Sequence, residues 1–92
     1  MQPEDIAAAT ATLFREHHGR LVALLAARTR DIAAAQDAVA EALRKACDHW
    51  PCQGLPANPA AWLLTAARNH LRDELRHGRV HDAFAVDYLA LH

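Results

Sequence analysis

Six side chains between residues 65 and 79 are of types that bind nucleic acids, and they recur at helical spacing. They are Thr65, Arg68, Asn69, Arg72, Arg76 and Arg79. At about 100° per residue, steps of three, one, three, four and three place them in one sector of a helix. Guanidinium groups bind phosphates through paired hydrogen bonds, and Asn and Thr side chains can reach base edges. The alternative is an ordinary solvated helix face, and periodicity alone does not separate the two interpretations.

The segment from Pro51 to Pro59, just before this helix, contains three prolines and a glycine. Such a segment is stiff, and it ends at a helix N-terminus, which favours anions. It could hold an unstacked base beside the basic helix. It could equally be a plain connection between two antiparallel helices.

Cys47, His49 and Cys52 lie close enough in the sequence to raise the possibility of a metal site. However, Cys47 falls on a face predicted to be buried, and no second Cys/His pair has ligand-like spacing. His77 and His81 are four residues apart, but a predicted helix end separates them. We therefore expect no structural metal and no other cofactor. A metal-dependent bundle enzyme would also need inward-facing carboxylates or histidines, which the predicted buried stripes do not contain.

These residues are expected to be positioned by an all-α fold, a small antiparallel bundle of three main helices. The first helix should run from an N-cap at Asp5 to about Arg30, with a possible bend or break near His18 because Gly19 follows. The second should run from about Asp31 to Trp50, since a proline follows and cannot continue it. The apolar positions expected to face the core are Ile6, Leu13, Phe14, Leu21, Leu24 and Leu25 in the first helix and Ile32, Ala35, Val39, Ala42, Leu43, Ala46, Cys47 and Trp50 in the second.

The third helix is predicted to open at Asn58-Pro59, an N-cap followed by proline at the first helical position, and to end near Arg76. Its buried stripe should contain Trp62, Leu63, Leu64, Ala67, Leu71 and Leu75. We interpret Trp50 and Trp62 as core anchors on either side of the loop. Residues 1–80 are expected to form the domain, and residues 81–92 the start of a linker or a C-terminal tail. That tail has the apolar spacing of a short fourth helix, with Phe84, Tyr88 and Leu91.

Composition agrees with one small helical domain of 92 residues, of which 52% are hydrophobic. The net charge of −1 is not typical of a protein that coats nucleic acid through bulk electrostatics. Residues 31–50 lean acidic and residues 66–81 lean basic, which indicates two different partners. Neither a membrane-spanning stretch nor a secretory leader is recognisable, and two cysteines are too few for a disulfide scaffold. We therefore expect a reduced, cytoplasmic protein with no membrane partner.

The order of the motifs resembles region 2 of bacterial sigma-70 factors of the extracytoplasmic-function (ECF) type. The resemblance covers about Leu13 to Arg79. It is closest to the subgroup whose loop contains Trp-Pro, Gly-x-Pro and Asn-Pro. The residues that carry it are Asp37-Ala38-Val39-Ala40-Glu41-Ala42-Leu43, Trp50-Pro51, Gly54-Leu55-Pro56 and Asn58-Pro59-Ala60-Ala61-Trp62-Leu63-Leu64-Thr65-Ala66-Ala67-Arg68-Asn69, followed by Asp73.

This resemblance implies a non-enzymatic transcription initiation factor with two binding surfaces. Asp37, Glu41 and Arg44 are expected to face core RNA polymerase, at the clamp helices of its largest subunit. The loop from Gln53 to Asn58 is the candidate pocket for a flipped base of the non-template strand. The residues expected to contact the minus-ten element of promoter DNA are Gln53, Gly54, Asn58, Thr65, Arg68, Asn69, Arg72, Arg76 and Arg79. The resemblance also implies a possible anti-sigma or sensory partner protein.

The sequence departs from the family pattern in two places. Ala40 stands where many sigma factors have glutamine, which removes one polar contact to polymerase. The loop has no aromatic residue to stack on an extruded base. The family's second DNA-binding domain is not in this sequence, so we expect a piece of a longer protein. The alternative from another class is a small helical protein–protein interaction module without DNA binding.

Overall fold

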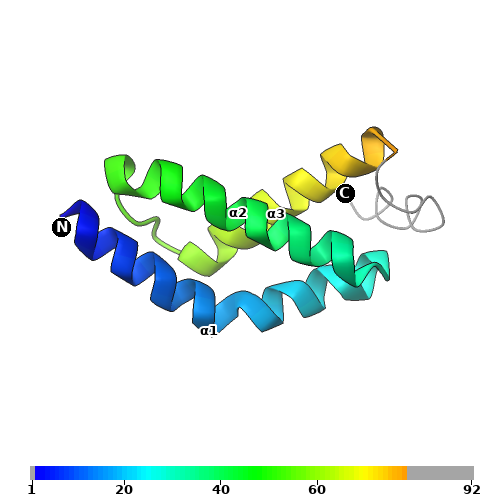
Figure 1. The fold of residues 1–92 in the computed structure, drawn as a ribbon, viewed down its shortest axis with the longest axis horizontal. Helices are drawn as coiled ribbons and strands as arrows, with labels where there is room; N and C mark the ends of the chain where they lie inside the picture. Colours follow the sequence, from blue (N-terminus) through cyan, green and yellow to red (C-terminus); the bar gives the residue numbers. More distant parts are fainter. Residues whose placement is uncertain (1, 79–92) are drawn as a thin grey trace.

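A computed structural model of the chain describes residues 2–78, and these residues form three α-helices. Helix α1 spans Pro3–Thr29, α2 spans Ile32–Gln53 and α3 spans Pro59–Arg76. Figure 1 shows α1 and α2 running antiparallel, with α3 crossing α2 obliquely. Helix α2 packs against both of the others, while α1 and α3 touch less. The all-α prediction is confirmed. The predicted tail helix and Arg79 lie outside the described residues.

Helix α1 begins earlier than predicted, because Gln2 and not Asp5 is its N-cap. Pro3 occupies the first helical position, where a missing N–H has no consequence. The Asp5 carboxylate instead accepts from the Gln2 N–H at 3.3 Å, inside the first turn. The helix is continuous through Gly19, so no break occurs there. Its axis changes direction near the middle so that it wraps around the core (Figure 1), as long helices commonly do.

Helix α2 continues past Pro51 to Gln53, so its predicted end at Trp50 is wrong. Proline has a helical φ but no N–H, so the last turn of α2 lacks one backbone bond. That turn is closed by the Gly54 N–H, which donates to the Trp50 carbonyl at 2.7 Å. Trp50 is 1% exposed, and its burial holds the backbone before the proline in the helical conformation.

The starts of α2 and α3 are capped by side chains, and of these two caps the one at Asn58 was predicted. The Asp31 carboxylate accepts from the Ala34 N–H at 3.0 Å at the start of α2. At the start of α3, the Asn58 side chain accepts from the Ala61 N–H at 3.1 Å. Each bond satisfies a backbone donor that the first helical turn leaves free. The third helix therefore begins and ends where the sequence predicted.

Within residues 2–78, six of the thirteen buried apolar residues of the core are alanines, and larger side chains lie between them. Its buried apolar members are Ile6, Leu21, Leu25, Ala35, Ala38, Val39, Ala42, Ala46, Trp50, Leu63, Ala66, Ala67 and Leu71. Two buried threonines, Thr10 and Thr29, donate their hydroxyls to the carbonyl four residues earlier, at 2.7 and 3.0 Å. The alanines let the three helix backbones approach closely.

Several predicted core positions lie elsewhere. Leu24 is 47% exposed and Ile32 is 63% exposed, and Cys47 is exposed on the surface of α2. Each lies at the margin of its helix's apolar stripe, where the neighbouring helix no longer covers it. Leu13, Phe14, Trp62, Leu64 and Leu75 are partly buried and pack against the core. Among residues 2–78, no helix is long and apolar enough to cross a membrane.

Candidate nucleic-acid and polymerase interface

A cavity of about 510 Å³ lies where α2, the proline-rich loop and the start of α3 meet. Helix α2 contributes Lys45 and His49, the loop contributes Pro56 and Asn58, and α3 contributes Ala61, Trp62, Thr65, Ala66 and Asn69. The wall thus combines cationic, hydrogen-bonding and aromatic groups. This is the combination that binds a base by stacking and hydrogen bonds and its phosphate by charge.

Three of the predicted DNA-contacting residues line this cavity: Asn58, Thr65 and Asn69. Thr65 and Asn69 are exposed and one helical turn apart on α3. Gln53 ends α2 on the surface and Gly54 follows it, and neither lines the cavity. Gly54 has φ +85°, a conformation that glycine adopts readily and other residues rarely do. The loop therefore contributes one polar residue, Asn58, to the wall of the cavity. Its glycine, Gly54, allows the chain to turn there.

The arginines of α3 form a row that begins at this cavity and continues along the helix, but they differ in their exposure to solvent. Arg68 and Arg72 are half-buried, whereas Arg76 is exposed. The Arg72 Nε is shielded from solvent and has no hydrogen-bond partner within residues 2–78. The Arg76 guanidinium lies 3.6 Å from the Asp73 carboxylate, and both side chains are largely in solvent. Arg76 is thus the most exposed of these three arginines.

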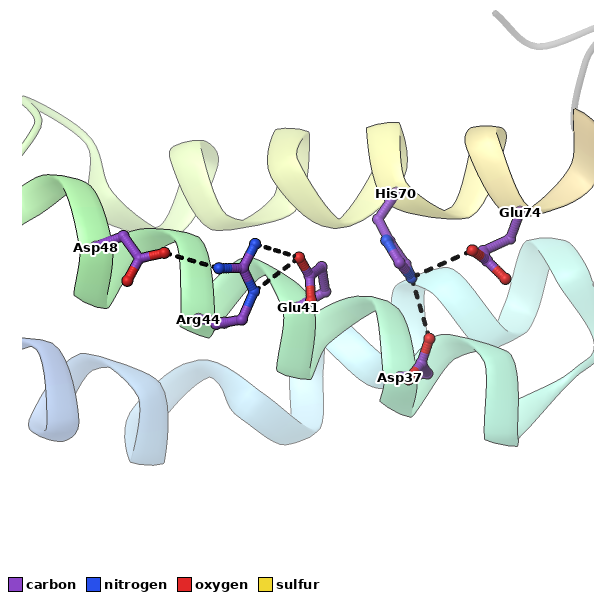
Figure 2. Close-up of polar contacts among 6 residues, drawn as sticks. All are labelled: Asp37, Glu41, Arg44, Asp48, His70 and Glu74. Atoms are coloured by element: carbon purple, nitrogen blue, oxygen red, sulfur yellow. Dashed lines mark hydrogen bonds and ion pairs between the residues drawn. The ribbon is translucent and has the colours of Figure 1, made fainter. Parts of the chain in front are cut away.

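The predicted polymerase-facing residues form a network of ion pairs on α2, shown in Figure 2. Arg44 donates to Glu41 at 2.6 and 2.9 Å and to Asp48 at 2.7 Å. The hydrogen bond from Arg44 holds the pKa of the Glu41 carboxyl below its usual value of 4.5. The same bond raises the pKa of Arg44. The acidic face therefore contains one cation held between two carboxylates.

Asp37 has a different role, because it joins α2 to α3. Its carboxylate lies 3.0 Å from His70 Nε2, and Glu74 lies 4.0 Å from the same nitrogen (Figure 2). The Asp37 side chain is still 70% exposed, so one of its oxygens remains accessible. The three predicted residues Asp37, Glu41 and Arg44 thus share one face of α2, with Asp37 also paired to His70 of α3.

Sequence reasoning missed four residues of this region: Lys45, His49, Trp62 and His70. Lys45 and His49 are one turn apart on α2, and an i, i+4 basic pair was a signal that could have been noticed. Trp62 is half-buried and packs edge-to-face on Trp50, with ring centroids 5.2 Å apart, yet it also lines the cavity. The interpretation of Trp62 as only a core anchor was incomplete. An aromatic group is present after all, supplied by α3 and not by the loop.

No group of three or more His, Cys, Asp or Glu side chains able to hold a metal ion occurs within the described residues. Cys47 and Cys52 are both exposed and unbonded to each other. The expected burial of Cys47 was wrong, because it lines an open cavity between α1 and α2.

Comparison with known proteins identifies the family. A sequence model described as Sigma-70 region 2 matches residues 13–80. The protein named ECF RNA polymerase sigma factor SigL of Mycobacterium tuberculosis is 42% identical over 74 residues, in each of the strains Erdman, CDC 1551 and H37Rv. The aligned part is 79% of this chain and 42% of that relative, so the chain spans less than half of the relative's length. No solved structure matches. The chain therefore belongs to the sigma-70 region 2 family, in its ECF branch.

Proposed function

We propose that this chain is the promoter-recognition domain of a sigma factor, which binds core RNA polymerase and the minus-ten element and catalyses no reaction. The observation that carries the proposal is the cavity of about 510 Å³ at the start of α3. It opens beside the arginine row, so one strand can lie along the row and place a base in the cavity. A plain adaptor domain has no need of such a junction.

Within this proposal, the arginine row holds phosphates at the upstream, still paired edge of the minus-ten element. Arg68, Arg72, Arg76 and Arg79 would act in this way, without reading sequence. Thr65, Asn69 and Asn58 are placed to contact the unpaired base, with Trp62 as its stacking surface and Lys45 and His49 beside its phosphate. Gln53 and Gly54 shape the loop from outside the cavity.

A neighbouring face of α2 would dock on polymerase through Asp37, Glu41 and Arg44, since Glu41 lies only one helical turn from the cavity-lining Lys45. The charges there are accessible, since Arg44 and Asp48 side chains are each 58% exposed. We propose the clamp helices of the largest subunit as the docking site, residues 1–80 as the domain, and the cytoplasm, where polymerase acts, as its location. An anti-sigma or sensory protein is a further proposed partner.

The test is promoter binding by holoenzyme reconstituted from this chain, using a promoter that the holoenzyme transcribes. The Asn69→Ala variant should lose about 1–3 kcal/mol of binding on that promoter and much less on one with a scrambled minus-ten element. Gln36→Ala is the matched control, because Gln36 is an exposed amide on α2 away from the cavity. Permanganate reactivity should report less strand opening for Asn69→Ala.

Two outcomes would count against the proposal. If Asn69→Ala and Gln36→Ala behave alike on both templates, Asn69 does not contact a base. If alanine substitutions at Asn69, Arg72 and Arg76 are all silent, α3 presents only a solvated face, and a protein–protein interaction module becomes the better description.

A further inference from the structure

The cavity beside Cys47 lies between the first half of α1 and the second half of α2, and its volume is about 330 Å³. It shares no lining residue with the first cavity, the one at the start of α3. Residues two positions apart on a helix point in nearly opposite directions, so Leu43 and Cys47 face away from Lys45 and His49. None of the residues proposed to contact DNA or polymerase lines the cavity beside Cys47. The proposed function therefore leaves it without a role.

The wall of this cavity is mostly apolar. Its lining residues are Ala7, Thr10, Ala11, Phe14 and Arg15 of α1 and Leu43, Cys47 and Pro51 of α2. The ring of Phe14 rests on that of His18, with centroids 4.8 Å apart, and this contact fixes one side of the wall. The Thr10 hydroxyl already donates to the Ile6 carbonyl at 2.7 Å. An apolar wall with few available polar groups is typical of small-molecule sites.

Arg15 is the cation of this wall. Its side chain is exposed, and it donates a long hydrogen bond, of 3.4 Å, to the Thr12 hydroxyl. It forms no ion pair within residues 2–78. No carboxylate is among the lining residues, and the nearby Asp48 accepts from Arg44 at 2.7 Å. The Arg15 guanidinium is therefore available to an anion from outside the chain.

The volume sets the size of the ligand. An apolar cavity of roughly 150 Å³ holds one benzene molecule. The cavity beside Cys47, of about 330 Å³, is about twice as large. It therefore has room for about ten carbon atoms, as in two fused aromatic rings.

We propose that this cavity binds a small apolar carboxylate whose hydrocarbon part has about ten carbon atoms. The hydrocarbon part packs on Phe14 and Leu43, and burial of its apolar surface drives binding. Arg15 holds the carboxylate at the exposed edge and selects the anion over neutral molecules of the same shape. The inference does not rest on the proposed function, so its failure leaves that function untouched.

The test follows the reaction of Cys47 with a maleimide, because the bound ligand covers this thiol. The Cys52→Ser variant of the chain isolates Cys47, and the labelling rate is measured by intact mass at increasing concentrations of 2-naphthoate. The neutral 2-naphthamide is the control for charge, and acetate is the control for the hydrocarbon part. The Cys47→Ser variant reports on Cys52, which is also exposed but does not line this cavity.

Two further substitutions in the Cys52→Ser background test the wall, each with a matched control. Ala11→Leu fills the cavity, and Ala8→Leu makes the same change at an exposed alanine of α1 outside the wall. Arg15→Gln removes the charge, and Arg28→Gln removes that of an exposed arginine elsewhere on α1. Circular dichroism checks that each variant is folded.

We expect 2-naphthoate to bind with a dissociation constant below about 1 mM. At ten times that constant, labelling of Cys47 should slow about tenfold, since only the unoccupied chain reacts, while labelling of Cys52 stays unchanged. Binding of 2-naphthamide should be about three- to tenfold weaker, and acetate should not protect. Arg15→Gln should weaken 2-naphthoate by the same factor and leave 2-naphthamide unchanged. Ala11→Leu should abolish protection by both, whereas Ala8→Leu and Arg28→Gln should behave as the parent.

The inference is overturned if 2-naphthoate protects neither cysteine or protects both equally, because the ligand then does not occupy the cavity. It is also overturned if 2-naphthamide protects as well as 2-naphthoate, or if Arg15→Gln and Arg28→Gln bind 2-naphthoate alike. If Ala11→Leu does not fold, the comparison of the two arginine variants and the two cysteines still decides the outcome.

Discussion

At the scale of single residues, side chains that share one sector of a helix can differ in their exposure to solvent. Arg72 and Arg76 belong to the same predicted sector, yet the Nε of one is covered and the guanidinium of the other is in solvent. Arg76 in turn forms an ion pair with Asp73, so a phosphate would have to compete with that carboxylate for the guanidinium. Exposed ion pairs of this kind contribute little to stability, so little free energy is lost if Arg76 leaves Asp73 for another anion, such as the proposed DNA phosphate.

Cys47 offers a direct test at this scale. Because its thiol is exposed and lines a cavity between α1 and α2, it should react with a maleimide in the folded protein. The Cys52→Ser variant, analysed by intact mass, isolates the reaction of Cys47. We expect complete labelling without denaturant, at a rate similar to that of Cys52 in the Cys47→Ser variant. Labelling of Cys47 only after unfolding would show that α1 covers it in solution.

At the scale of elements, α2 contributes to both proposed surfaces and α3 to the proposed DNA-binding surface. The polar side chains of α2 divide between the network around Arg44 and the cavity-lining pair Lys45 and His49. His70 of α3 meets Asp37 between these elements. The orientation of α3 is therefore tied to the helix proposed to dock on polymerase.

The ion-pair network of α2 permits a charge-swap experiment. Glu41→Lys should weaken binding to core polymerase, but it also breaks the bonds from Arg44. The double variant Glu41→Arg with Arg44→Glu restores an i, i+3 pair within the helix while inverting the charges shown to a partner. If polymerase contacts these charges, binding should stay weak in the double variant, most clearly at low salt. Recovery of parental affinity would mean that only the helix's internal pairing matters.

The loop between α2 and α3 can be tested through its glycine. Alanine at position 54 meets no neighbour within 4 Å, but φ +85° strains it, by about 1–3 kcal/mol. Gly54→Ala should therefore displace the loop and impair strand opening, measured by permanganate, while polymerase binding stays parental. Gly19→Ala is the matched control, since Gly19 is helical and also has open space around it. Equal strand opening by the two variants would show that the loop geometry is not used.

At the scale of the whole molecule, the stability of an alanine-rich core depends strongly on its few large side chains. Trp50 is the largest fully buried side chain, and it contacts Trp62 beside the first cavity. Its Nε1 finds no acceptor within residues 2–78, so hydrophobic contact and ring packing provide its stabilisation.

Trp50→Ala should destabilise the chain by about 3–5 kcal/mol, a large part of the stability of a small domain. Urea unfolding followed by circular dichroism measures this directly. Leu24→Ala is the control, because Leu24 is 47% exposed and its truncation should cost far less. Similar losses for both variants would show that Trp50 does not anchor the core as the structure indicates.

The amino-acid sequence by itself determined the features that depend on local chemistry. Spacing, together with residues whose conformational preferences act over one turn, determined three kinds of feature. These are the three helices, the caps at Asp31 and Asn58, and the row from Thr65 to Arg76. Where a local preference competed with burial, sequence reasoning failed. Pro51 was expected to end α2, but the helix continues past it because Trp50, the residue before it, is buried in the helical conformation.

The tertiary structure alone decided which helices meet at the start of α3. Lys45 and His49 join Asn69 on one side of that turn, while Arg20 joins Asn58 on the other. The residues that meet are up to thirty-eight positions apart, as for Arg20 and Asn58, and no pattern along the chain indicates that they are close. The packing angle between two helices decides which of their residues come into contact. That angle depends on how many side chains fit together at once. Exposure at the edge of a stripe, as for Cys47 and Leu24, depends on the same angle.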